Sequence, residues 1–165
     1  MSFPTQTNKY LALGKPGTRA SANPVYYVPG QNVADKSGVT AGTFAWSAAG
    51  IEDSEIYNPT TYSNSGTGKP AGFVEALTLQ DYINDINSDA SMLIPAGHGV
   101  NIARSGDFFA TVTAAATLGQ KVFAKEADGT ISTASAGATV SGYVETDWQV
   151  SQGTDAAGVI IISKQ

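Results

Sequence analysis

The side chains that could carry catalysis are few in this sequence, and their surroundings do not suit a reaction. The one histidine is His98, in the glycine-rich stretch 95–99, where a histidine is more often a surface residue than a catalytic base. Ser105 lacks the glycine two positions before it that a strained nucleophile turn requires. We therefore expect no catalytic residue and no enzymatic activity.

Carboxylates are numerous, but they do not form a recognisable glycosidase or metal motif. Asp81 and Asp85 are four residues apart, on the polar face of an expected helix, where solvated charges are usual. Residues 84–89 lack the glycine and the terminal glutamate of a calcium loop. The stretch 66–70 ends in Pro70, where a phosphate loop carries a hydroxyl residue. We predict no metal and no cofactor.

The two tryptophans could stack on sugars or bases. Trp46 and Trp148 each lie among alternating apolar residues, as core and interface aromatics do. A core or interface position is therefore the preferred interpretation for both.

Composition narrows the class of protein. Only 14% of the 165 residues are charged, against a usual ~25%. Glycine and the strand-forming residues are abundant, which indicates an all-β domain. The net charge of −5 repels phosphate, so nucleic acid is not an expected partner. There is no cysteine, no signal-peptide pattern and no apolar run of membrane-spanning length, so we expect a soluble protein without a membrane partner.

Residues 1–29 are punctuated by proline and glycine and have no apolar periodicity. Such a segment cannot bury its isolated aromatic side chains on itself, so it orders only against another surface. We predict an extended N-terminal arm over 1–29 and a single β domain over 30–165.

Within 30–165, short apolar runs alternate with turn signals. Residues 58–70 predict an exposed loop, and the spacing of apolar residues over 79–88 predicts one short amphipathic helix. Many short strands at this spacing favour a sandwich or a small barrel. The expected strands are 33–34, 39–46, 72–79, 92–94, 99–103, 107–113, 121–125, 131–133, 139–146 and 159–163, with turns at 35–38 and 105–107 among those that separate them.

Several of these stretches together resemble a known family. They are 14–24 (GKPGTRASANP), 38–44 (GVTAGTF), 95–100 (PAGHGV), 106–109 (GDFF), 117–124 (TLGQKVFA) and 128–131 (DGTI). In this order they are similar to the structural cement, or capsid decoration, proteins of tailed phages, over about residues 14–163. The loop 58–70 and the helix 79–88 have no counterpart in that pattern.

The resemblance implies a compact jelly-roll-like sandwich or small barrel on the outer surface of a virion, made in the cytoplasm of a bacterial host. It would bind the major capsid protein and stabilise the expanded head. It would also form a homo-oligomer, a trimer in preference to a dimer, with the arm laid across neighbouring capsid subunits. The capsid-binding residues expected on the arm are Tyr10, Leu11, Leu13, Lys15, Pro16, Arg19, Pro24 and Tyr26. We expect Lys15 and Arg19 to pair with acidic residues of the capsid.

Two other functions stay open from the sequence. One is a receptor-binding or tail-fibre domain that recognises host glycans through the loop 58–70 and the aromatics Trp46, Tyr57 and Tyr62. The other is a hydrolase with an unrecognised motif. Neither explains the proline-punctuated arm.

Overall fold

The computed structural model describes residues 14–48, 59–76 and 91–165, and these form strands and connecting turns without a helix. It contains no helix in these ranges that is long and apolar enough to cross a membrane. The strands are β1 (Tyr26–Tyr27), β2 (Asn32–Ala34), β3 (Val39–Thr40), β4 (Phe44–Ala48), β5 (Thr60–Ser63), β6 (Gly72–Val74), β7 (Leu93–Ile94), β8 (Ile102–Val112), β9 (Lys121–Lys125), β10 (Ile131–Ala134), β11 (Tyr143–Gln152) and β12 (Gly158–Lys164). The predicted all-β class is confirmed.

The C-terminal strands close into a five-stranded barrel. Its order is β10-β9-β11-β12-β8, and the parallel pairing of Ile131 with Val112 joins β10 back to β8. Closure leaves no free sheet edge around the barrel. Of the two predicted architectures, the small barrel is therefore the one observed, and the pairings of the described strands do not form a jelly-roll sandwich.

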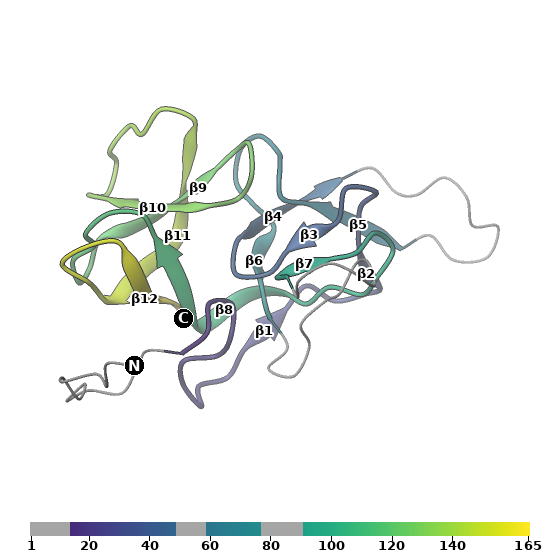
Figure 1. The fold of residues 1–165 in the computed structure, drawn as a ribbon, viewed down its shortest axis with the longest axis horizontal. Coiled ribbons are helices and arrows are strands. Elements are labelled where there is room, and N and C mark those ends of the chain that lie inside the picture. Colours follow the sequence, from purple (N-terminus) through teal and green to yellow (C-terminus); the bar gives the residue numbers. More distant parts are fainter. Residues whose placement is uncertain (1–13, 49–58, 77–90) are drawn as a thin grey trace, which may run out of the picture.

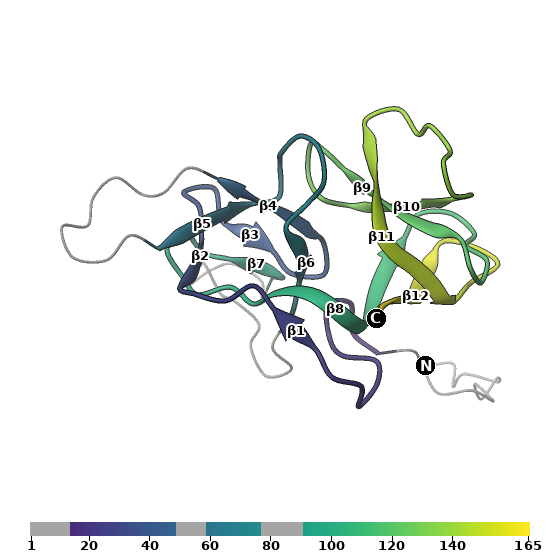
Figure 2. The ribbon, with the colours of Figure 1, turned by 180° about the vertical axis from the view of Figure 1, so that it is seen from behind.

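The remaining strands extend from the other half of β8. The sheet continues from β8 through β6, β4 and β5 to β2, while β3 and β7 form a separate pair. Figures 1 and 2 show the barrel at one end of the molecule and β2, β3, β5 and β7 at the other, with β8 running between them. Strand β8 thus belongs to both halves of the molecule.

An aromatic cluster joins the two halves. Phe44 on β4 and Phe73 on β6 pack against Phe108 and Trp148 of the barrel, with ring centroids 5.3 to 6.2 Å apart. These four side chains are at most 2% exposed, and aromatic pairs at this spacing add to the free energy gained by burial. The predicted core position of Trp148 is confirmed.

Several predicted elements differ from the observed ones. Thr60–Ser63, predicted as part of an exposed loop, is strand β5, because it lies between β4 and β2 with Tyr62 buried. The turn predicted at 105–107 is absent, and strand β8 continues without interruption through these residues. Gly106 adopts a φ of 123°, where β8 changes its neighbour from β6 to β12. The predicted helix 79–88 lies outside the described residues.

Candidate functional site

Residues 14–29, called here the arm segment, lie along β8 of the same chain. The amide of Gly17 donates to the carbonyl of Phe109 at 2.7 Å, and the amide of Val28 donates to that of Ile102 at 2.9 Å. Between them, β1 pairs with β8 in antiparallel register. The predicted arm needs a surface on which to become ordered. For residues 14–29 that surface is β8 of the same chain.

A buried carboxylate holds the bend at residues 21–23 of the arm segment. Asp107 on β8 is 9% exposed and accepts hydrogen bonds from Ser21 Oγ and Asn23 Nδ2, both at 2.6 Å, and from Ser163 Oγ. Burial by itself raises the pKa of Asp107, but the hydrogen bonds from Ser163, Ser21 and Asn23 outweigh it and lower the pKa below 3.8. Asp107 is thus a charged anchor for residues 21–23.

A second buried carboxylate holds the segment further along. Glu75, 7% exposed, accepts from Arg19 Nε at 2.8 Å, from Tyr27 Oη at 2.7 Å and from Asn101 Nδ2 at 3.2 Å. Burial, and then the hydrogen bond to Glu75, raise the pKa of Tyr27 to about 12, so its hydroxyl stays protonated and donates. We name Glu75 and Asp107 the two carboxylate anchors.

The predicted capsid-binding residues fall into three groups. Lys15, Pro24 and Tyr26 are exposed, and Tyr26 retains 69% of its accessible surface. Pro16 is half-buried, and the side chain of Arg19 already has an acidic partner, Glu75, within the chain. Three further predicted residues lie outside the described ranges: Tyr10, Leu11 and Leu13.

Tyr26 borders a hollow of about 300 Å³. The backbone of β1 is held by β8 on one side, so the ring projects from a fixed strand rather than from a loose loop. The other residues that line the hollow are Asn23, Pro24, Ser105, Gly106, Asp107, Lys164 and Gln165. An exposed aromatic beside a hollow is typical of a protein-binding surface.

Two of the three aromatics predicted for a glycan site are buried. Trp46 and Tyr62 are 5% and 2% exposed, and Trp46 Nε1 donates to the carbonyl of Gly68 at 2.7 Å. Tyr57 lies outside the described residues. Because a sugar needs an open ring face, neither Trp46 nor Tyr62 can serve as a stacking platform.

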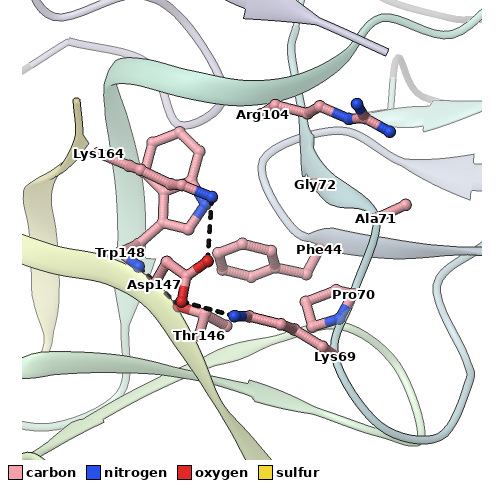
Figure 3. A pocket seen from close by; sticks show the side chains of 10 residues that line it. All are labelled: Phe44, Lys69, Pro70, Ala71, Gly72, Arg104, Thr146, Asp147, Trp148 and Lys164. Carbon is pink, nitrogen blue, oxygen red and sulfur yellow. Dashed lines mark hydrogen bonds and ion pairs between the residues drawn. The ribbon is translucent and has the colours of Figure 1, made fainter.

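A small hollow between the barrel and the loop after β5 holds a cluster of charges (Figure 3). Asp147 on β11 accepts from Lys69 Nζ at 2.6 Å and from Lys164 Nζ at 3.1 Å, and Arg104 lines the same hollow. Hydrogen bonds from Lys69 and Lys164 lower the pKa of Asp147. The hollow, about 20 Å³, has room for about one water molecule, so it does not accommodate a small-molecule substrate.

The arrangement offers no catalytic centre in the ranges that the structure describes. His98 is exposed, and its Nδ1 lies 3.3 Å from the carbonyl oxygen of Ala96. No group of three His, Asp, Glu or Cys residues that could hold a metal occurs there. The surface position predicted for His98 is confirmed.

Sequence reasoning missed the two carboxylate anchors and the Asp147 cluster. One signal was present for Asp107, because an acid directly before the apolar run 108–112 is unusual in a strand unless it has a partner. No signal marked Glu75, whose partners are 26 to 56 positions away.

The comparisons with known proteins point to a phage capsid. A family model described as XM1 gp53 minor capsid protein matches residues 3–164. A solved chain from the capsid of Myoviridae phage XM1 has the same fold, with a TM-score of 0.61 and 19% identity over 99% of this chain and 97% of that one. The sequence matches no curated protein.

Proposed function

The chain belongs to the XM1 gp53 minor capsid protein family, and from that premise we propose that it is a cement protein that binds the exterior of a phage head and stabilises it. The resemblance to phage capsid proteins predicted from the sequence is confirmed by this membership. A capsid structural role, and hence a place in the virion, follows from the family. Cementing, the outer surface and the major capsid protein as partner are our proposal.

The observation that carries the proposal is the exposed face of the arm segment. Tyr26, Pro24 and Lys15 are exposed on a segment whose backbone is fixed to β8. A fixed segment loses little conformational entropy when a partner covers it, so more of the burial free energy becomes affinity.

The size of this contribution follows from the exposure of Tyr26. A tyrosine buries roughly 150–250 Å² at ~25 cal/mol per Å², so covering a ring that is 69% exposed contributes about 3 kcal/mol before the costs of association. Such a modest gain per copy suits a decoration protein, because many copies act together on one shell.

The rest of the proposal extends from this face. Residues 1–13 continue the chain from Gly14 and carry Tyr10, Leu11 and Leu13, which we propose as further contacts with neighbouring capsid subunits. Their apolar side chains would gain from burial on a second protein. We propose a homo-oligomer at local symmetry axes, a trimer before a dimer, without enzymatic activity.

Co-sedimentation with expanded, undecorated capsids tests the proposal. We expect saturable binding by the full chain, and Tyr26→Ser to weaken it by about 30-fold or more, as the loss of a buried aromatic anchor does. Leu118→Ser is the matched control, because Leu118 is also a large exposed hydrophobic residue, 74% exposed, in the turn between β8 and β9. A deletion of residues 1–13 tests their share.

The deletion must end before Gly14. A chain that starts at Gly30 would leave Glu75 without Arg19 and Tyr27. It would also remove two of the three donors to Asp107, so misfolding would imitate a loss of binding. Full-length protein that stays in the supernatant at high concentration, or a Tyr26→Ser variant that binds like the wild-type protein, contradicts the proposal.

A further inference from the structure

Positive charge is concentrated at the junction of the barrel with the loop after β5. Lys69, Arg104 and Lys164 line one hollow, and Lys121 lines an adjoining one of about 380 Å³ together with Lys164. Asp147 lines both hollows. It is the one acidic side chain among their lining residues and receives both Lys69 and Lys164 (Figure 3). We call these four cations and Asp147 the basic patch.

Two other carboxylates lie close to lining residues of the patch. Glu126 accepts from the amide of Gly68, the residue before Lys69, at 3.1 Å. Asp107 borders another hollow together with Lys164 and accepts from Ser21, Asn23 and Ser163. The patch thus keeps an excess of positive charge that a carboxylate-rich partner would neutralise.

The sequence contains such a partner. The described residues carry eight Lys or Arg and eight Asp or Glu, so their charges balance. The negative charge of the chain comes from residues 49–58 and 77–90, which hold three acidic residues each and no basic ones. In 49–58 the three acids, Glu52, Asp53 and Glu55, fall within four positions.

We propose that the basic patch binds the acidic segment 49–58 of a second copy of this chain. The segment connects β4 to β5, and β5 lies at the end of the molecule away from β10 and β12 in both ribbon views (Figures 1 and 2). A contact between two different surfaces is head-to-tail, and such contacts close into rings when the rotation between copies permits. The inference thus names a surface for the proposed homo-oligomer, and it rests on that part of the proposed function.

Sedimentation velocity of the purified full chain over a range of concentrations tests the inference without capsids. We expect concentration-dependent association that weakens as salt is raised from 0.1 to 1 M, because the Debye length falls from about 10 to about 3 Å. Lys121→Glu and Arg104→Glu are each expected to weaken it by about ten-fold or more. Lys36→Glu, on the exposed turn before β3, carries the same charge change outside the patch and serves as the control.

Complementary variants give the decisive comparison. One carries R104E and K121E, and the other carries E52K, D53K and E55K. We expect each variant alone to be monomeric and their equimolar mixture to associate, because the mixture restores opposite charges across the contact. Pairing of 49–58 with its own patch would leave the wild-type chain monomeric, so association of both the wild type and the mixture excludes it.

Three outcomes would overturn the inference: a wild-type chain that is monomeric at every concentration, patch variants that associate like Lys36→Glu, or a mixture that stays monomeric. Capsid co-sedimentation of the same variants separates this inference from the proposed function. Variants that fail to self-associate but still decorate capsids would implicate the patch in oligomerisation alone.

Discussion

The Asp107 anchor gives the sharpest test of how the arm segment is held. In Asp107→Asn the amide keeps the shape of the side chain but loses the charge that strengthens the bonds from Ser21, Asn23 and Ser163. A hydrogen bond to a charged group contributes about 1 kcal/mol more than a neutral one, and relief of the buried charge offsets part of that gain. We therefore expect the free energy of unfolding to fall by about 2 kcal/mol at neutral pH.

Urea denaturation measures this loss. An equal slope of the free energy of unfolding against urea concentration would show that wild type and Asp107→Asn expose the same surface on unfolding. Asp155→Asn is the matched control, because Asp155 is exposed in the turn before β12 and the same chemical change there should alter stability by less than about 0.5 kcal/mol. Hydrogen exchange adds a local readout, since the amide of Ala20 donates to the carbonyl of Asp107 and should exchange faster in Asp107→Asn.

The pH dependence follows from the direction of the shift. The pKa of Asp107 is lower in the folded protein than its ordinary value of 3.8, so the folded state binds fewer protons near that pH. The stability contributed by the carboxylate is fully present above about pH 4 to 5 and is lost as pH falls through the folded pKa. The difference between wild type and Asp107→Asn should therefore shrink in acid. A difference below about 0.5 kcal/mol at neutral pH, or one that persists undiminished in acid, refutes the reasoning.

Three further predictions concern the fold. Arg19→Met should lower the free energy of unfolding by about 1 to 2 kcal/mol in urea, since Glu75 is left buried without its cation while Arg19 itself is half exposed; an unchanged midpoint would contradict this. The absorbance of ionised tyrosine should show a titration step near pH 12 that is absent in Tyr27→Phe. Because the pKa of Tyr27 is raised in the folded protein, the free energy of unfolding should fall as pH rises from 10 to 12. Gly129→Ala should cost about 3 kcal/mol or prevent folding, because its Cβ would lie 2.1 Å from the carbonyl oxygen of Phe44. Gly137→Ala, with a similar positive φ but open space, should cost only about 1 kcal/mol. Thermal melts of the two variants compare the losses, and equal losses would refute the packing argument.

Local signals in the sequence were sufficient where neighbours in the chain are also neighbours in space. The run 121–125 is strand β9 with the predicted bounds, and it pairs with β10 across the turn at 128–129. The alternating apolar residues of β11 and the continuous apolar run of β12 likewise mark the strands, although their ends differ from the expected ones by up to six residues. In such hairpins the turn residues and the period of two determine the structure.

Non-local pairing decided the rest. The loop signal over 58–70 was wrong for Thr60–Ser63 because the polar strand β5 gains its hydrogen bonds from β2 and β4, which a local window does not contain. Gly106 and Asp107 read as a turn for the same reason, since the partners of Asp107 are 56 to 86 positions away.

The sequence by itself determined the all-β class, the absence of disulfides and the concentration of negative charge in 49–58 and 77–90. It also carried enough of the capsid family's pattern to predict a viral structural protein. Only the tertiary structure decided that the arm segment lies on its own β8, that Arg19 pairs within the chain, and that Tyr26 remains exposed. The physical reason is that a buried carboxylate or a strand edge selects its partner by position in the folded chain, and that position depends on every other pairing at once.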